Sequence, residues 1–460
     1  MQDKHHFHRI MVMLLIIASL WRSANAKPGE YPSADKFVEQ QTLQDRISQH
    51  GKVRVLARLS TGEPSALQSL QARTFSRADI HAVQDRVLKR HFGQSNAAHA
   101  ATGQPDIRRF ESSPLLAITV DQAELDALAE DSDIAAIMPD RLFRPLLQNS
   151  VPLIGMTGVD GAFRLGATGA GQAVAVLDTG VHAQHPFLAG KVIAEACFST
   201  NAYDGAVTSL CPNKANTQTG PGAANATTPA CLNGSTNLCA HGTHVAGIAV
   251  GRNPSAGIPP SGVARNASLV AMQVFSRING QADCGTGVRV CLGAFESDIL
   301  AAMDWLYGNL FSLPGGIKLA ALNLSLGYDA YGQACDFDSL KPAIDRLRSA
   351  GVATVAAVGN EGLINAVTAP ACISSAIAVG ATSKSDWVAP YSNESATLVD
   401  LLAPGGDQRF GVSGGIYSSV PRGVYAYQQG TSMAAPHVAG GIAALRSRLP
   451  YATSVRSRTP

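Results

Sequence analysis

Three polar residues stand in settings where side-chain chemistry is expected: Asp178, His241 and Ser432. Asp178 directly follows the apolar run AVAVL, His241 opens the small-residue stretch HGTHVAGIAVG, and Ser432 follows Gly-Thr in QGTSMAAPHVAG. A serine hydroxyl is a weak nucleophile unless a base removes its proton. An imidazole can do this, and a carboxylate can orient that imidazole and stabilise its cationic form. Together the three residue types predict acyl transfer through a serine nucleophile.

Asp178 and Ser432 each have a simpler structural explanation. An aspartate after a strand often forms a turn, and a serine before a helix often serves as its N-cap. For Ser432 that explanation is weakened because Thr431 could cap the helix equally well. The Asp-Thr-Gly triplet at Asp178 also occurs in aspartic proteases, which need two facing loops. The chain has no second Asp-Thr-Gly or Asp-Ser-Gly, so this class is disfavoured.

Two further histidines accompany these motifs, His244 and His437. The H-x-x-H spacing of His241 and His244 could bind a metal, but the stretch lacks the glutamate of the H-E-x-x-H motif. We therefore expect His244 and His437 to be packed, hydrogen-bonded histidines.

An amide side chain supplies one more candidate group. Asn360 follows Gly359 just past the apolar run VATVAAV. A fixed amide donor in a water-poor site can stabilise the oxyanion that develops when a hydroxyl attacks a carbonyl. A turn-forming asparagine is the alternative, and the local sequence favours the two equally.

The elements that must position these residues follow from the apolar runs after Val151. The runs are AVAVL, SLVAMQV, LAALNLS, VATVAAV, AIAVG and LVDLL, and helical stretches such as 297–309 and 337–350 lie between several of them. Such alternation predicts an α/β fold with a buried parallel sheet and helices on both faces. Ligands of such folds bind beyond the carboxyl ends of the strands, where Asp178 and Asn360 stand.

Residues 27 to about 148 differ from the rest of the chain, since they hold most of the clearly amphipathic stretches and no cysteine. Residues 53–59, 113–120 and 134–140 are expected as strands, and residues 78–92 and 121–131 as helices. This order predicts a small α+β domain of the split β-α-β, ferredoxin-like type.

Composition bounds the partners and the destination of the chain. Of its 460 residues 46% are apolar and 15% charged, and the net charge is +2. Without a basic block, nucleic acid and anionic membranes are not expected partners. Residues 1–26 combine a polar start, the apolar run MVMLLIIASLW and the small-residue end Ala24-Asn25-Ala26, which is typical of a secretory signal peptide. After its removal we expect a secreted protein without a membrane anchor.

All eight cysteines lie between Cys197 and Cys372, and four of them fall in a Gly-, Asn- and Thr-rich insertion at residues 197–240. An even number in an exported chain predicts disulfides, although eight cysteines allow many pairings. Local spacing favours Cys284–Cys291, is compatible with Cys197–Cys211 and Cys231–Cys239, and leaves Cys335–Cys372. A metal site before His241 is the alternative, but a paired C-x-x-C spacing is missing.

Four segments, VAVLDTGVHAQHP, HGTHVAGIAVG, AAVGNEG and GTSMAAPHVAG, resemble the catalytic segments of the subtilase family of serine proteases. The resemblance covers roughly residues 151–449, and the order Asp, His, Ser matches the order known for subtilisin. It implies Asp178, His241 and Ser432 as the catalytic triad. It also implies that Asn360 and the backbone N–H of Ser432 form the oxyanion hole.

The same resemblance implies residues for substrate and metal. The stretch LNLSLG is similar to the substrate-binding strand of the family, so its residues would pair with substrate backbone: Ser325, Leu326 and Gly327. The primary specificity pocket would be lined by Ala357, Val358 and Gly359. Asp400 matches a position that ligates calcium in the proteinase K group, which implies a structural calcium ion and no catalytic cofactor.

The resemblance further implies the organisation of the chain. Residues 1–26 would be the signal peptide, residues 27–148 an inhibitory propeptide that assists folding and is then cut off, and residues 149–460 the catalytic domain. Self-cleavage would fall near Leu146 to Asn149. The implied function is that of a secreted serine endopeptidase, made as a self-processing zymogen and active on polypeptides as a monomer.

Three features depart from the family pattern. They are the cysteine-rich insertion, the loop QADCGTGVRVCLG in place of a short Gly/Ser edge segment, and an end only 28 residues after Ser432 (460 − 432). Family members usually continue with another helix and strand, so a truncated C-terminus is expected. Two alternatives stay open: an inactive or truncated relative that acts as a binding protein, and a hydrolase of small esters. The strand around Ser325 favours polypeptide substrates.

Overall fold

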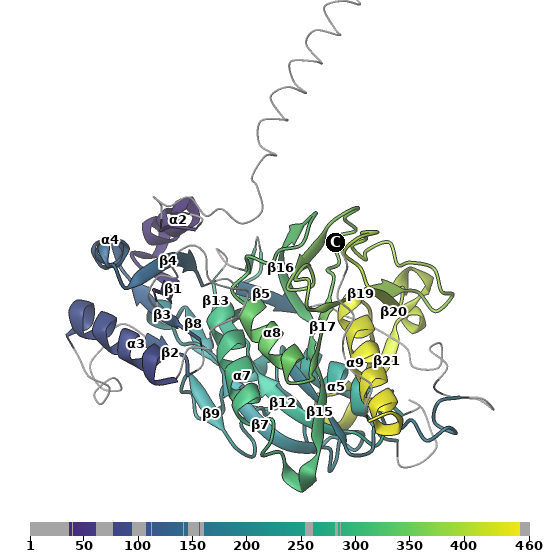
Figure 1. Ribbon diagram of the computed structural model, residues 1–460. Helices are drawn as coiled ribbons and strands as arrows, with labels where there is room; N and C mark the ends of the chain where they lie inside the picture. The colour runs from purple at the N-terminus through teal and green to yellow at the C-terminus, as the bar shows by residue number, and fades with distance from the viewer. Residues whose placement is uncertain are drawn as a thin grey trace, which may run out of the picture.

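The computed structural model describes residues 36–38, 40–60, 77–93, 107–111, 113–140, 142–145, 156, 161–253, 261–280, 284–285 and 287–450. The predicted signal peptide (1–26) and the predicted cleavage region (146–149) lie outside these residues. Within them the chain forms a small N-terminal unit beside a larger C-terminal unit (Figure 1).

An eight-stranded sheet forms the centre of the larger unit, and its strands run parallel except for one at the edge. Its order is β20 (Leu401–Pro404), β19 (Ile377–Thr382), β17 (Ala353–Ala357), β15 (Lys318–Leu324), β6 (Gln172–Asp178), β12 (Ser268–Gln273), β7 (Val192–Phe198) and the antiparallel β9 (Thr217–Thr219). The predicted α/β fold with a buried parallel sheet is therefore confirmed.

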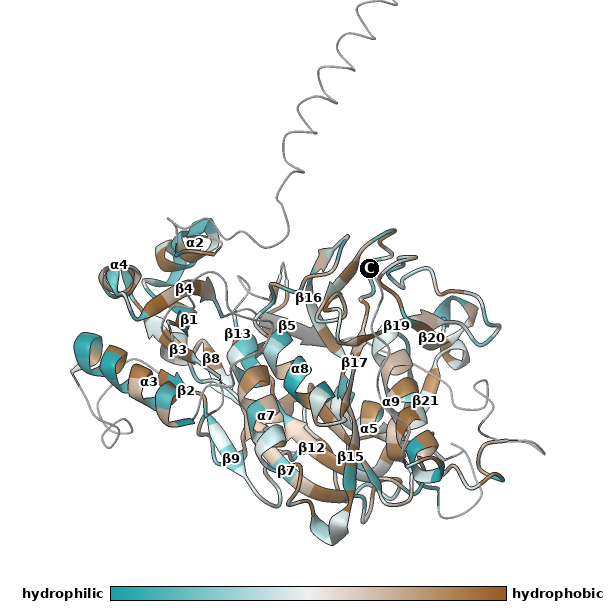
Figure 2. Ribbon diagram, in the orientation of Figure 1, coloured by the Kyte–Doolittle hydropathy of each residue, from teal (hydrophilic) through white to brown (hydrophobic). Residues whose placement is uncertain are grey.

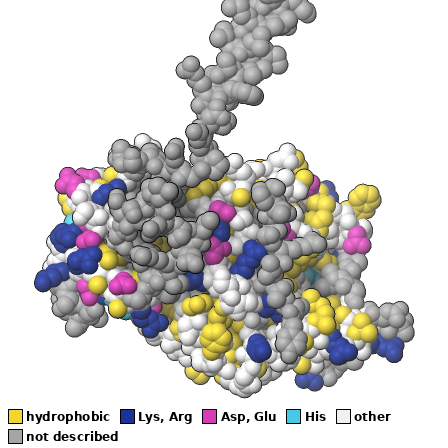
Figure 3. Space-filling view, viewed as in Figure 1, with side chains coloured by type: hydrophobic (Ala, Val, Ile, Leu, Met, Phe, Trp, Pro, Cys, Tyr) yellow, Lys and Arg dark blue, Asp and Glu magenta, His cyan; other side chains and the backbone are white. Residues whose placement is uncertain are grey.

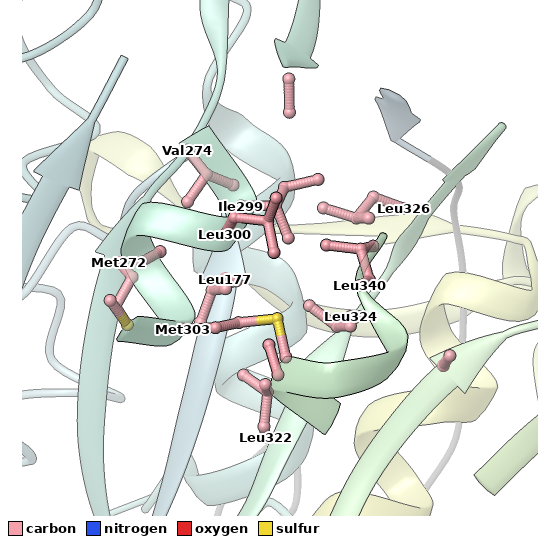
Figure 4. Packing of buried hydrophobic residues seen from close by; sticks show 14 of the residues in the cluster. Leu177, Met272, Val274, Ile299, Leu300, Met303, Leu322, Leu324, Leu326 and Leu340 are labelled. Atoms are coloured by element: carbon pink, nitrogen blue, oxygen red, sulfur yellow. The ribbon is translucent and has the colours of Figure 1, made fainter. Parts of the chain in front are cut away.

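Helices cover both faces of this sheet because successive strand residues point to opposite sides. In β6, Ala175 and Leu177 join one apolar cluster, whereas Val174 and Val176 join the other. The first cluster includes residues of α7 (Glu296–Gly308) and α8 (Lys341–Ser349), and Figure 4 shows the side chains of α7 packing onto Leu177 and its neighbours. The second includes α5 (Ala240–Val250) and α9 (Thr431–Arg448). Figure 2 shows β12 and α9 as hydrophobic along much of their length.

One strand differs from its predicted bounds. The run LVDLL predicted a strand over 398–402, but β20 begins only at Leu401. Residues before it form a turn in which the Ser395 hydroxyl accepts the backbone N–H of Leu398 at 3.3 Å. Asp400 therefore stands just ahead of the strand, at its amino end.

A second, antiparallel sheet lies beside the first and includes β5 (Leu142–Pro145), the strand that follows the N-terminal unit in the chain. Its order is β18 (Val367–Ala369), β16 (Leu326–Tyr331), β5, β14 (Val290–Phe295), β13 (Ser276–Asn279) and β8 (Val207–Ser209). The segment β5 lies between β14 and β16 and pairs with both. The predicted loop QADCGTGVRVCLG thus ends in β14, which is one of the two walls around β5.

The N-terminal unit is a four-stranded antiparallel sheet in the order β2 (Ile107–Arg109), β3 (Leu115–Val120), β1 (Val53–Leu59) and β4 (Ile134–Pro139). Three helices accompany it: α2 (Gln40–His50), α3 (Arg77–Phe92) and α4 (Gln122–Glu130). The strands and helices predicted for this unit all form. The sequence pattern missed α2 and the short β2. A capping box starts α4, in which Asp121 and Glu124 each accept the other's backbone N–H.

The N-terminal sheet uses its two faces differently. Val55 and Ile118 pack with the helices of the unit, whereas Leu56 and Ala117 belong to an apolar cluster of the larger C-terminal unit. Figure 3 shows Lys and Arg side chains mixed with Asp and Glu on the visible outer surface of the N-terminal unit. The inner face is therefore an interface between the two units.

Buried charges complete that interface at the N-terminus of α7. Arg54 donates to Asp140 at 2.9 Å with both side chains fully buried, and Asp140 accepts the backbone N–H of Ser297 at 2.8 Å. Arg108 forms an ion pair with Asp298 at 2.7 Å. A carboxylate at a helix N-terminus is favourable, because backbone N–H groups there point outward without intrahelical partners.

Four disulfides form, between Cys197 and Cys211, Cys231 and Cys239, Cys284 and Cys291, and Cys335 and Cys372. These are the four pairs expected from local spacing, so the disulfide prediction is confirmed. The alternative of a metal site formed by cysteines before His241 is wrong, because these cysteines are in disulfides. Within the ranges given above, no helix is long and apolar enough to cross a membrane.

Candidate active site

Asp178 and His241 come together at the carboxyl end of the parallel sheet. Asp178 is the last residue of β6, and His241 lies in the first turn of α5. The imidazole Nδ1 is 2.6 Å from Asp178 Oδ1, and the two side chains are 4% and 0% exposed. Because the carboxylate can only accept, Nδ1 carries the hydrogen and Nε2 remains to act as a base.

A glycine allows α5 to approach the end of β6 this closely. A Cβ atom on Gly242 would lie 2.3 Å from the carbonyl oxygen of Gly180 and 3.1 Å from Asp178 Oδ1. Any side chain at this position would push the first turn of α5, and His241 with it, away from Asp178.

Ser432 lies in the first turn of α9, which is buried over most of its length. Gly430 is the N-cap residue, with a φ of 145° that favours glycine. The expectation that Thr431 could cap the helix is wrong, because the helix begins at Thr431 and its hydroxyl bonds to Asn360 and Gly359. The small residues of α9 permit close packing on α5: a Cβ on Gly440 would be 2.8 Å from the Ala249 carbonyl oxygen.

Ser325 is bound to Ser432 in both directions. The Ser432 hydroxyl donates to the Ser325 carbonyl oxygen at 3.2 Å, and the Ser325 hydroxyl donates to the Ser432 carbonyl oxygen at 2.7 Å. That carbonyl is free to accept because Pro436, four residues on, has no N–H to offer it. Ser432 is therefore fixed beside the residue that precedes β16.

Asn360 is bound to Thr431, the residue before Ser432, and its amide therefore has a defined orientation. Its Oδ1 accepts the backbone N–H of Thr431 at 2.8 Å and the Thr431 hydroxyl at 3.0 Å. Since Thr431 holds the amide oxygen, the amide NH₂ is the end that remains for a ligand. The adjacent helix N-terminus adds backbone donors and a partial positive charge.

The residues Leu326 and Gly327 pair with the backbone of β5. Leu326 stands opposite Pro145 and Gly327 opposite Arg144, while Ala294 of β14 stands opposite Phe143 on the other edge. An extended segment of the chain thus lies antiparallel between two strands at the site, as an added strand does in peptide recognition.

The segment Ala357–Gly359 lies next to this groove, but its side chains do not all face it. Ala357 and Val358 are fully buried and join opposite apolar clusters, so only their backbone and Gly359 can line a pocket. Sequence reasoning missed Thr368, which lies in β18 between Gly327 and Gly359. Cβ atoms on Gly327 and Gly359 would each be 2.7 Å from a Thr368 side-chain atom. Thr368 sits in an apolar stretch, AVTAP, whose pattern carries no signal for this role.

His244 and His437 are packed histidines, as predicted. His244 Nε2 is 3.1 Å from the carbonyl oxygens of Ile416 and Ala426, and His437 Nδ1 is 2.6 Å from the Met433 carbonyl oxygen. Burial lowers the pKa of His244 to about 3. A neutral imidazole that donates to carbonyl groups stabilises the packing of α5 on the hairpin of β21 (Ile416–Val420) and β22 (Val424–Gln428).

Asp400 is exposed, and one of its carboxylate oxygens accepts the backbone N–H of Ala378 at 2.8 Å. No group of three His, Cys, Asp or Glu side chains suited to a metal occurs among the residues that the structure describes. The side chains around Asp400 therefore do not by themselves form a metal site. Calcium binding at Asp400 stays a prediction.

Comparison with known proteins decides the family. The subtilase family (Peptidase_S8) matches residues 169–459, which include every candidate residue named above. The chain belongs to the subtilase family. Subtilases are serine endopeptidases, so this subtilase is a hydrolase that acts on polypeptides.

Individual relatives agree with this assignment. The subtilase is 33% identical to an alkaline protease of Alkalihalobacillus alcalophilus over 353 residues, which cover 76% of this chain and 74% of the relative. It is 31% identical to subtilisin E of Bacillus subtilis (strain 168) over 355 residues, or 76% and 75% of the two chains. The solved structure of the epidermin leader peptide processing serine protease of Staphylococcus aureus shares the fold. That structure is 16% identical, with a TM-score of 0.59 over 86% of this chain and 88% of the other.

Proposed function

We propose that this subtilase is made as a secreted zymogen that cleaves itself and then hydrolyses peptide bonds through an acyl-enzyme on Ser432. The observation that carries the proposal is the position of β5. Residues 142–145 lie between β14 and β16 as an added antiparallel strand, and β16 follows directly on Ser325, which is bound to Ser432. A segment held in this way is in the orientation of a substrate.

In the proposed reaction, Asp178, His241 and Ser432 form the triad. His241 Nε2 takes the hydroxyl proton while Ser432 Oγ attacks the carbonyl carbon, and Asp178 stabilises the imidazolium. The amide NH₂ of Asn360 and the N–H of Ser432 donate to the oxyanion. His241 then returns the proton to the leaving amine. The acyl-enzyme is hydrolysed by water, which His241 deprotonates in turn.

The register of β5 narrows the cleavage region proposed at 146–149. In an antiparallel pair each further residue of one strand faces the preceding residue of the other. Pro145 faces Leu326, and Ser325, the residue before Leu326, is bound to Ser432. The end of β5 therefore points toward the proposed nucleophile. We expect cleavage after Leu146, at the near end of the region.

The N-terminal unit, within residues 27–148, would act as the intramolecular inhibitor. Support comes from its buried contacts with α7 through Asp140 and Arg108, and from β5, which fills the groove that a substrate would use. We further propose export by way of the signal peptide at residues 1–26, a monomeric state and a structural calcium ion at Asp400. None of these is needed for the chemical steps above.

The test is the intact mass of the secreted wild-type protein beside that of Ser432→Ala. We expect the wild type to lose the residues up to Leu146 and the variant to keep them, because only the wild type has the nucleophile. If both keep the N-terminal unit, self-processing is refuted and a binding role for this chain gains support.

A further inference from the structure

The first turn of α5, which carries His241, is held without the usual capping groups. The N-cap residue is Cys239, whose side chain makes no capping hydrogen bond, and the first turn has no acidic residue. Unsatisfied N–H groups at a helix N-terminus favour fraying of that turn. Other contacts must therefore hold His241 at hydrogen-bonding distance from Asp178.

Thr179 is one link between the two catalytic candidates. Its backbone N–H donates to Asp178 Oδ1 at 2.7 Å, the oxygen that also accepts His241 Nδ1. Its hydroxyl donates to the Cys239 carbonyl oxygen at 3.0 Å and accepts the backbone N–H of Gly242 at 2.9 Å. The Thr179 hydroxyl thus joins Cys239, two residues before His241, to Gly242, the residue after it.

The disulfide joins Cys239 to a hairpin that is fixed from outside. Cys231 and Cys239 are fully buried, and the hairpin of β10 (Leu232–Asn233) and β11 (Thr236–Asn237) lies between them. Arg277 of β13 donates to the carbonyl oxygens of Ala230 at 3.2 Å and Leu232 at 2.7 Å. Asn237 accepts the backbone N–H of Cys239 at 2.8 Å. Through these contacts the antiparallel sheet holds the start of α5.

We propose that the Cys231–Cys239 disulfide is a positioning element of the reaction, which holds the first turn of α5 so that His241 keeps its geometry toward Asp178 and Ser432. This inference rests on the proposed function of the triad. It assigns a catalytic consequence to the cysteine-rich insertion, whose other disulfide, Cys197–Cys211, lies at the end of β7, two strands away from β6 and Asp178. A misplacement of about 1 Å can lower a catalytic rate by roughly 100-fold.

The experiment compares two double variants of the full chain, Cys231→Ala/Cys239→Ala and, as the matched control, Cys197→Ala/Cys211→Ala. All four cysteines are buried and both pairs lie in the insertion. For each processed enzyme we would measure kcat per active site, with sites counted by burst titration, together with KM and Tm. We expect both variants to lose thermal stability. Only the first should lose kcat per site, by roughly 10- to 100-fold with KM unchanged.

Equal kcat per titrated site in the two variants would overturn the inference, because a purely structural disulfide lowers the number of folded molecules and not the rate of each. If the first variant does not fold, Thr179→Val and Thr179→Ser replace it. We then expect Val to lower kcat and Ser, which keeps the hydroxyl, to restore it; unchanged kcat in Val would refute the inference. A wild type without any burst would instead refute the proposed function itself.

Discussion

Arg108 offers the sharpest test of how the N-terminal unit is held on the larger C-terminal unit. Its side chain is 9% exposed, and its guanidinium lies 2.7 Å from the carboxylate of Asp298, which is fully buried. It also donates to the carbonyl oxygen of Asn216 at 3.2 Å. Arg108→Met keeps most of the apolar stem and removes the charge. Asp298 then keeps the hydrogen bonds from Thr200 at 3.1 and 3.2 Å and the weaker influence of the Arg54 charge, but it loses its ion-pair partner.

The expected magnitude follows from the burial of the pair. Removing one partner of a buried ion pair costs about 3–5 kcal/mol, because the other charge stays in a low-dielectric site. At tenfold for each ~1.4 kcal/mol, the noncovalent complex after self-cleavage should weaken by roughly 10²- to 4 × 10³-fold, mainly through faster dissociation. Burial raises the pKa of Asp298 to about 6. Below that pH the Asp298 carboxyl is protonated and neutral, so that loss of the Arg108 charge costs less. The complex should therefore be weakened less at pH 5 than at pH 8.

The assay follows the precursor in time. Gel electrophoresis reports self-cleavage, hydrolysis of a chromogenic peptide reports free enzyme, and the lag between the two gives the release rate of the N-terminal unit. Arg109→Met is the matched control, since Arg109 is the next residue of β2 and pairs with the exposed Asp85 inside its own unit. An exposed pair contributes only about 0–1 kcal/mol, so this change should leave the lag nearly unaltered.

Two results would refute this reasoning. One is an equal lag for Arg108→Met and Arg109→Met at pH 8. The other is a failure of Asp298→Asn, added to Arg108→Met, to restore a large part of the lag, because removing both charges should be far less costly than leaving one buried.

Three further outcomes are expected. Asn360→Ala should lower kcat by roughly 10²- to 10³-fold with little change in KM, and an effect on KM alone would remove Asn360 from the oxyanion hole. Thr368→Gly should raise kcat/KM for Phe over Ala before the scissile bond by roughly tenfold, and an unchanged ratio would show that Thr368 does not bound the pocket. The pKa of His244 is lowered to about 3, so its contribution to the stability of the folded chain is full above pH ~6.5 and is lost as the pH falls toward 3. Urea unfolding of Ser432→Ala at pH 7 and pH 4 should show this loss, by about 3 kcal/mol, and the added change His244→Gln should remove most of it; equal pH slopes would contradict the assignment.

Much of the site could be predicted because its signals are local. Asp178 ends an apolar strand, and His241 and Ser432 open helices made of small residues, so each position follows from its own neighbourhood. The disulfides were predictable for a related reason. Three of them close short loops, with sequence separations of 14, 8 and 7, and the fourth pair was left by elimination.

Other features could not be read in this way because their partners are distant in the chain. The bonds of Arg108 to Asn216 and of Ser325 to Ser432 join residues 108 and 107 positions apart. Such contacts leave no periodicity in a local window. The helix α2 escaped prediction because Leu43 is its one buried residue, too weak an apolar pattern to mark a helix.

The sequence by itself indicated the family and determined the parallel sheet and the disulfide framework, since motifs, apolar runs and short spacings are properties of single segments. Tertiary structure alone decided that residues 142–145 lie between β14 and β16, that Thr368 lies between Gly327 and Gly359, and that Cys239 is bound to Thr179. Each of these depends on which strands and helices become neighbours, and burial of apolar area over the whole fold determines that choice.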